Sequence, residues 1–116
     1  MKLRVKKSGI HGKGLFAAED IPWGAKIIEY KGELISDSEA EARIENGADC
    51  IFELRKNENL DGAIDGNDSR YTNHDRTNPN CFVLRDDNRI WIVAGIEGVR
   101  KGEELVYDYG SNFYPL

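Results

Sequence analysis

The stretch GEELVYDYG, residues 102–110, carries the pattern from which fold and function can be predicted together. Gly102 marks a turn, and the mostly apolar residues after it predict a strand over 105–109. Tyr107 and Tyr109 are two residues apart, so on a strand their side chains point to the same face. Phenol hydroxyls can hold an amine or polarise a reacting group. An aromatic ladder on a sheet explains the pair without any chemistry, and for Tyr-x-Tyr alone it is the simpler interpretation.

A polar loop is the second informative stretch. Residues 66–80 contain Gly, Asn, Asp, Thr and Pro with few aliphatic residues, which predicts an ordered loop or no regular structure. Two segments of it, RYTNH (70–74) and NPNC (78–81, ending on Cys81), are dense in hydrogen-bonding side chains. The pair Asn73-His74 could recognise an amino-acid headgroup or the edge of a purine. A loop packed by its own Asn and Asp side chains is an equal alternative.

A third motif lies near the amino terminus, where the sequence HGKG occupies residues 11–14. Gly12 and Gly14 let the backbone approach a ligand closely or adopt positive φ. A plain hairpin turn explains such a motif in most proteins. No helix pattern follows it, so the motif is not a Rossmann dinucleotide fingerprint.

The remaining sequence predicts short strands punctuated by twelve scattered glycines. One helix stands out over about 37–46, because Ser36 and Glu39 form a capping box and Asn46-Gly47 supplies a stop. Lys31-Gly32 predicts a tight turn between two strands. The strand candidates, besides 105–109, are 2–7, 15–18, 26–30, 33–35, 51–54, 60–65, 82–84 and 89–94. With 116 residues and no linker-like segment, residues 1–116 are predicted to form a single β-rich domain.

Composition and charge exclude some functional classes and favour others. The longest apolar run covers only residues 91–96, which is too short to span a membrane. The net charge is −5, from 16 basic and 21 acidic residues, so we do not expect direct binding to nucleic acid. Residues 37–68 hold ten acidic residues against three basic ones. This segment would suit a basic partner, or it is simply a solvated surface, which charge alone favours.

The cysteines and histidines argue against metal or disulfide chemistry. Cys50 and Cys81 are the two cysteines, and His11 and His74 are the two histidines. Their spacing matches no zinc site, and two cysteines cannot form a disulfide framework. We therefore expect no metal and a reducing, intracellular environment: the cytoplasm of a bacterium, or the nucleus of a eukaryote or of a cell infected by its virus.

The motifs become specific when their order is considered, because the chain resembles the SET-domain protein lysine methyltransferases over essentially its whole length. It resembles the small form of the family without a cysteine-rich zinc segment after the domain. The resemblance implies a mostly β fold of the β-clip type, with several small sheets and a knot-like C-terminal crossing. The matching segments are residues 12–17, 20–24, 29–35, 70–74, 78–81 and 102–110.

The same resemblance implies an activity. The chain is expected to transfer a methyl group from S-adenosylmethionine to a lysine amine of a protein, leaving S-adenosylhomocysteine. The substrate is expected to be a basic tail of a histone or of another nucleic-acid-associated protein, added as a strand. The chain itself is expected to be a monomer or homodimer.

Residue roles carry over by position. Tyr109 resembles the catalytic tyrosine, and Tyr107 occupies the position that sets the degree of methylation, so that monomethyl-lysine is the expected main product. Tyr30 resembles a further aromatic residue of the lysine channel. The residues that resemble cofactor contacts are Gly12, Lys13, Gly14, Arg70, Asn73 and His74, with Phe113 or Tyr114 covering the adenine.

The chain departs from the family pattern at three places, which leaves alternatives open. The loop after His74 is one residue longer than the common form, Cys50 stands where many members have a tyrosine, and the cysteine-rich segment is absent. A catalytically silent SET fold that binds peptides is therefore the alternative, and a purely structural β-domain is a more remote one.

Overall fold

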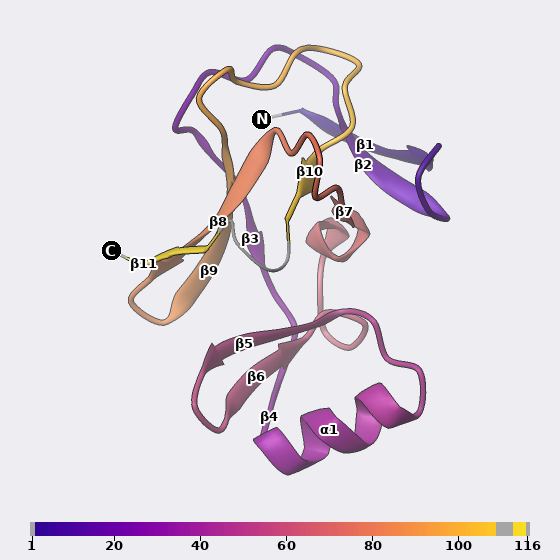
Figure 1. Ribbon diagram of the computed structural model, residues 1–116, viewed down its shortest axis with the longest axis vertical. Helices are drawn as coiled ribbons and strands as arrows, with labels where there is room; N and C mark the ends of the chain where they lie inside the picture. Colours follow the sequence, from indigo (N-terminus) through magenta and orange to yellow (C-terminus); the bar gives the residue numbers. More distant parts are fainter. Residues whose placement is uncertain (1, 109–112, 116) are drawn as a thin grey trace.

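Strands predominate in the computed structural model, which describes residues 2–108 and the backbone of residues 113–115. Within these residues the strands form four small sheets, accompanied by one α-helix and one short 3-10 helix (Figure 1). The predicted mostly β class with several small sheets and one clear helix is thereby confirmed.

The first sheet is an antiparallel ribbon of β1 (Leu3–Lys7) and β2 (Lys13–Ala17). Leu3 lies opposite Ala17 and Val5 opposite Leu15, so the apolar side chains of both strands share the inner face. Leu15 is fully buried there. The second strand begins two residues earlier than predicted, because pairing with β1 continues to Lys13.

The central sheet has the order β11-β8-β9-β3. Its members are β3 (Lys26–Tyr30), β8 (Cys81–Asp86), β9 (Arg89–Ala94) and β11 (Phe113–Pro115). The hairpin predicted between β8 and β9 is confirmed, and Asp87 adopts a φ of 57° in its turn. The prediction that 105–109 is the last strand was wrong, because β11 follows it and adds to β8 in parallel, a long-range pairing that local sequence does not encode.

A third sheet, β4-β6-β5, lies with the α-helix at one end of the molecule (Figure 1). It contains β4 (Glu33–Ile35), β5 (Ile51–Arg55) and β6 (Glu58–Asp61). Lys31-Gly32 makes no tight turn and instead carries the chain from the central sheet to this one. A Cβ atom on Gly32 would lie 2.5 Å from the carbonyl carbon of Asp61, so only glycine fits the passage.

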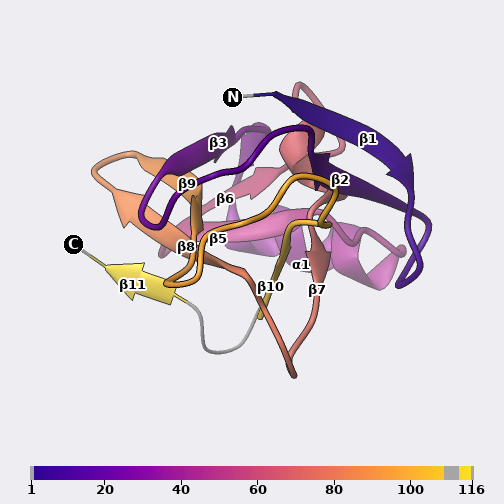
Figure 2. The ribbon, with the colours of Figure 1, turned by 90° about the horizontal axis from the view of Figure 1, so that it is seen from above.

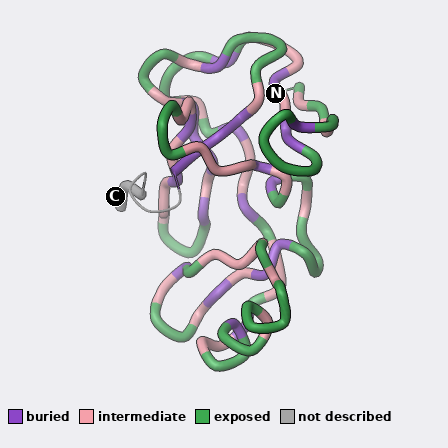
Figure 3. The backbone as a smooth tube through the Cα atoms, turned by 45° about the vertical axis from the view of Figure 1, so that its right-hand side comes forward, coloured by how far each residue is buried: buried purple, intermediate pink, exposed green. Residues whose placement is uncertain are grey.

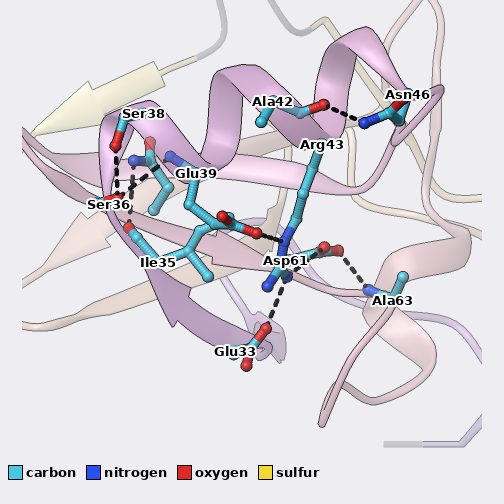
Figure 4. Close-up of polar contacts among 11 residues, drawn as sticks. Glu33, Ile35, Ser36, Ser38, Glu39, Ala42, Arg43, Asn46, Asp61 and Ala63 are labelled. Carbon is cyan, nitrogen blue, oxygen red and sulfur yellow. Dashed lines mark hydrogen bonds and ion pairs between the residues drawn. The ribbon is translucent and has the colours of Figure 1, made fainter.

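Helix α1 (Asp37–Glu45) confirms the predicted boundaries, since Ser36 accepts a hydrogen bond from the Glu39 N–H at 3.2 Å and Asn46 caps the other end. Figure 4 shows how the helix is held against the sheet. The Arg43 guanidinium bonds Glu33 of β4 at 2.6 Å, Glu39 at 2.8 Å and Asp61 of β6 at 3.0 Å. These carboxylates raise the pKa of Arg43 above its ordinary value, so it remains charged.

The predicted loop 66–80 contains two short elements. These are η1 (Asp68–Tyr71), capped by the Asn67 side chain, and β7 (Asn73–His74). β7 pairs in parallel with β10 (Val106–Tyr107), so the two most informative stretches of the sequence lie side by side (Figure 2). The pairing explains why so polar a segment is extended.

The segment 104–107 is bonded along both edges. On one edge it pairs with β7, and on the other Asn80 receives a bond from the Val106 N–H at 2.9 Å and donates its amide to the Glu104 carbonyl at 2.8 Å. The loop between β7 and Asn80 thus runs around β10. This arrangement is the C-terminal crossing that the resemblance implied.

Buried residues follow the strands of the central sheet and the inner face of β2, whereas most of α1 is exposed (Figure 3). The fully buried core includes Leu15, Ile90, Ile92, Ala94 and Leu105. Among the described helices, none is long and apolar enough to cross a membrane.

Candidate functional site

The glycine turn between β1 and β2 is rigidly built. Ser8, almost fully buried, accepts hydrogen bonds from the N–H groups of Ile10 at 2.9 Å and His11 at 3.3 Å. Its own N–H donates to the Gly12 carbonyl at 2.8 Å. Gly12 has a φ of 48°, a conformation that glycine adopts without strain.

Asn73 ties this turn to the Asn-His stretch. Its Nδ2 lies 3.1 Å from the carbonyl oxygens of both His11 and Lys13, and 2.8 Å from Oε2 of Glu104. Among the described residues, none donates a hydrogen bond to Oδ1 of Asn73. The amide therefore fixes the turn with its nitrogen and keeps an acceptor for a ligand.

Glu104 is the centre of this network. Its carboxylate accepts from Asn73 and also from the Ser8 hydroxyl, at 2.8 and 2.9 Å. Gly14 lies directly against it: a Cβ atom at position 14 would sit 2.8 Å from Cδ of Glu104 and 3.1 Å from Cβ of Ser8. A side chain at position 14 would therefore force the Glu104 carboxylate to move.

Five of the predicted cofactor residues line one cavity of about 430 Å³. The glycine turn, through residues 10–13, contributes one wall, the stretch 70–74 another, and Asp49-Cys50 a third. The structure therefore brings together positions about sixty residues apart in sequence, while Gly14 lies outside the lining. The predicted residues in the lining are Gly12, Lys13, Arg70, Asn73 and His74.

Two cationic side chains and one aromatic ring line this cavity. The Tyr71 ring has the Arg70 guanidinium 4.9 Å and the Lys13 ammonium 6.0 Å from its centroid. Cationic groups over a ring are attracted by its negative face. His74 on the neighbouring strand has Nδ1 3.8 Å from the Asp108 carboxylate. The cavity can accept a ligand that carries both a carboxylate and a flat or cationic group.

Tyr30, Phe52 and Tyr107 form an aromatic cluster that contacts the backbone of Cys50. The Phe52 ring contacts Tyr30 at 4.3 Å and stacks on Tyr107 at 5.6 Å between centroids. Tyr30 is 2% exposed and Tyr107 is 1% exposed. The Tyr30 hydroxyl donates to the Cys50 carbonyl at 2.7 Å, which holds the start of β5 against the cluster. The structure thus places two of the predicted channel residues together through Phe52.

Cys50 is half-buried and forms part of the cavity wall. Burial raises the pKa of its thiol to about 11, and the bond to the Asp49 carboxylate at 3.3 Å acts in the same direction. At neutral pH the side chain is a neutral thiol, a small and weakly polar wall for the cavity.

A second hollow has a volume of about 500 Å³. Phe52 lines it together with Ile44, Ala48 and Ile51, flanked by Asp49 and Glu53. Phe52 also stacks on Tyr107, so the aromatic cluster borders the second hollow. Asp49 lines both hollows.

Three predicted residues cannot be placed in this site. Tyr109 lies outside the described residues, and of Phe113 and Tyr114 the structure describes only the backbone, in β11 beside Val83 and Leu84. Their roles stay predictions. No group of three His, Cys, Asp or Glu side chains within the described ranges is arranged to hold a metal ion.

Sequence reasoning missed Ser8, Glu104 and Tyr71 as members of the site. Ser8 precedes a glycine turn, a position where a hydroxyl often bonds the backbone, so a signal was present. Tyr71 and Glu104 were within quoted motifs. The contact of Tyr71 with Lys13 crosses 58 positions of sequence and that of Glu104 with Ser8 crosses 96, so neither could be predicted without the fold.

Comparison with known proteins assigns the same segments to one family. A family model described as SET domain matches residues 12–110. The match contains residues 12–14 of the glycine motif, the Asn-His stretch and the segment through Tyr109, all identified above.

Similar sequences are histone-lysine N-methyltransferases by name. EZH2 of Chaetomium thermophilum is 41% identical over 116 residues, covering 88% of this chain and 8% of the relative. Trithorax of Drosophila virilis is 35% identical over 117 residues, covering 94% of this chain and 3% of the relative. This chain therefore spans less than a tenth of each of these two relatives.

Similar solved structures belong to polycomb repressive complex 2. One is "ctPRC2 in an autoinhibited conformation bound to S-adenosylmethionine", with a TM-score of 0.79 and 40% identity, covering 96% of this chain and 15% of that chain. Another is ctPRC2 in complex with H3K27me3 and H3K27M, with a TM-score of 0.83 and 38% identity, covering 99% and 15%.

Proposed function

The chain belongs to the SET-domain family, and on this premise we propose that it transfers a methyl group from S-adenosylmethionine to a lysine side chain of a protein. The observation that carries the proposal is the cavity that joins the Gly12-Lys13 turn to Arg70 and Asn73-His74. The ctPRC2 structure bound to S-adenosylmethionine, 40% identical in sequence, supports it.

The residues of the cavity fit this cofactor. Lys13 and Arg70 offer cations for its carboxylate, and Oδ1 of Asn73 is an acceptor for its polar hydrogens. The Tyr71 ring and the neutral Cys50 thiol add less polar walls. When bound, S-adenosylmethionine would supply a methyl group on a sulfonium sulfur. A neutral lysine amine could accept this methyl group in line, with S-adenosylhomocysteine as the thioether that leaves.

The residues near the aromatic cluster would prepare the acceptor. A lysine ammonium has an ordinary pKa near 10.4, so it must lose its proton before it can attack. Burial among aromatic side chains such as Phe52 and Tyr107 disfavours the charged form. Tyr109 would orient the amine and the methyl group, and most of the rate would come from positioning.

The second hollow is the proposed entrance for the substrate. Phe52 connects it to Tyr107, and β5 is the outer strand of its sheet, where an extended peptide can add as a further strand. Asp49 and Glu53 flank this hollow, which favours a basic peptide. The ring of Tyr107 is held by Phe52, consistent with a narrow channel and with monomethyl-lysine as the main product.

A catalytically silent, peptide-binding SET fold is the second candidate. One observation favours it. The Tyr30 hydroxyl is bonded to the Cys50 carbonyl and Tyr107 is buried, so the described residues leave little access for a lysine side chain to the aromatic cluster. Intracellular location and a monomeric or dimeric state stay predictions.

Asn73→Ala tests the cofactor site. Loss of the bonds to His11 and Lys13 should loosen the turn, and we expect S-adenosylmethionine affinity to fall at least about ten-fold by calorimetry. Asn78→Ala is the matched control, because Asn78 is exposed and its side chain forms no hydrogen bond with the turn among the described residues. Equal affinity of Asn73→Ala and the unmutated chain would remove Asn73 from the site.

A further inference from the structure

The outer strand of the first ribbon presents a row of cations. Along β1 the side chains of Leu3 and Val5 turn inward, so Arg4 and Lys6 share the outward face. Lys2 precedes them and Lys7 ends the strand, and all four cations are exposed. Alternate residues of a strand repeat about every 6.6–6.8 Å, which spreads these charges along a straight edge.

These cations form no ion pair through their side chains within the described part of the chain, although the backbone N–H of Lys2 donates to the Glu19 carboxylate at 3.1 Å. Of the ion pairs formed among the described residues, none involves Lys2, Arg4, Lys6 or Lys7. Residues 2–18 contain five cations and no carboxylate, whereas residues 19–116 contain the other eleven cations and all 21 carboxylates. The net charge of −5 is therefore the sum of a basic segment, residues 2–18, and an acidic remainder.

The two charged regions are separated in space. The β1–β2 ribbon lies in the upper half of the molecule and α1, with its acidic side chains, at the lower end (Figure 1). β1 forms the outer side of the ribbon when the molecule is seen from above (Figure 2). A long polyanion can therefore lie along β1 without meeting the acidic end.

The chemistry of the ribbon favours a duplex backbone over a single strand. Single-stranded nucleic acids are held by aromatic rings on which bases stack. Phe16, opposite Arg4, is the aromatic residue of this face, and the Lys6 ammonium lies 4.4 Å from its ring centroid. The ring is covered and half-buried, while the phosphates of a duplex need only a row of accessible cations.

We propose that the β1 edge, through Lys2, Arg4 and Lys6, binds the phosphate backbone of duplex DNA. The expectation that the chain does not bind nucleic acid rests on its net charge of −5. At β1 the exposed charges are positive, so the net charge of the whole chain does not exclude binding there. The contact is independent of methyl transfer, because none of the three residues lines the cavity or the second hollow.

The test is binding of the full chain to a fluorescent 20-base-pair duplex, followed by anisotropy between 50 and 200 mM salt. The variant Lys2→Gln/Arg4→Gln/Lys6→Gln removes three phosphate contacts. We expect affinity at the lowest salt to fall more than about ten-fold and the slope of log K against log salt to shrink by about 2.7.

The matched control is Lys31→Gln/Lys56→Gln/Arg89→Gln, which removes three exposed cations elsewhere. It carries the same net charge as the ribbon variant, so retained affinity would assign binding to β1. Failure of the unmutated chain to bind the duplex, or equal losses in both variants, would overturn the proposal. So would binding to vesicles of anionic lipid without binding to DNA, or salt-sensitive self-association without DNA.

A circular dichroism spectrum and S-adenosylmethionine binding check that the ribbon variant is folded. If the triple variant does not fold, Arg4→Gln and Lys6→Gln tested singly should each reduce the slope by about 0.9. An unchanged slope in both would contradict the proposal.

Discussion

Glu104 holds other residues of the site in place, although it does not itself line the cofactor cavity. Its carboxylate accepts from Ser8 and from Asn73, and it sits where a side chain on Gly14 would lie. Removing an acceptor from a part-buried network leaves its donors unsatisfied. The cofactor turn is therefore sensitive to changes that never touch the cofactor.

Gly14→Ala should reduce S-adenosylmethionine affinity at least about ten-fold, because the added Cβ displaces Glu104 and releases Asn73. Gly9→Ala is the control, since nothing lies within 4 Å of a Cβ atom there. Calorimetry on both variants decides the matter. Full affinity in Gly14→Ala would show that Glu104 can move without cost to the turn.

Cys50 should be slow to alkylate at pH 8. A pKa of about 11 makes its thiolate about 100-fold rarer than that of a thiol with a pKa of 9.0, and iodoacetamide reacts with the thiolate. Mass spectrometry should show a rate that rises as pH increases toward 11. The same chain unfolded in urea is the control, and an equal rate in the folded state would contradict the raised pKa.

The same shifts make stability fall at alkaline pH. Burial raises the pKa of Cys81 to about 12 and of Cys50 to about 11, above the value of 9.0 in an unfolded chain. Stability from the two neutral thiols is complete below pH 9, and it decreases as pH rises through 9 toward 12 because only the unfolded chain ionises.

At the scale of elements, some parts of the fold are determined by local sequence and others by pairing between distant segments. The capping box predicted α1 and the turn residues predicted the β8–β9 hairpin, since both depend on neighbours in sequence. The tight turn predicted at Lys31-Gly32 was wrong, because Gly32 is needed where the backbone of the distant Asp61 approaches the chain. The parallel pairings of β10 with β7 and of β11 with β8 join distant segments and leave no local pattern.

Arg43→Ala should detach α1 from its sheet. Asp61 is 3% exposed, and without the guanidinium its carboxylate keeps only the hydrogen bond from the Ala63 N–H, at 3.0 Å, within the described part of the chain. We expect the midpoint of thermal unfolding to fall by about 5 °C or more, because a buried carboxylate loses its cation.

Two further variants control for the helix itself. Glu41→Ala changes an exposed residue of α1 and should leave the midpoint within about 2 °C. Arg43→Lys keeps the charge but not the forked geometry, so its midpoint should be intermediate. Equal midpoints for Arg43→Ala and Glu41→Ala would show that the ion pairs do not hold the helix.

At the scale of the whole molecule, the fold separates three surfaces: the cofactor cavity, the second hollow beside β5 and the basic edge of β1. Sequence order identified the cavity, because its residues fall in motifs that occur together. The second hollow and the aromatic bridge through Phe52 could not be predicted, since they depend on how β5 packs against β10. Only the acidic charge beside that hollow was visible in the composition.

Methyl transfer itself is the most direct test of the proposed function. The chain, incubated with methyl-labelled S-adenosylmethionine and histones or a mixed cell lysate, should place the label on lysine side chains of a protein. Tyr109→Phe should bind the cofactor equally well but transfer at least about ten-fold more slowly, about 1.4 kcal/mol or more in the barrier. Cofactor binding without transfer to any protein, or equal rates for the two chains, would contradict the account.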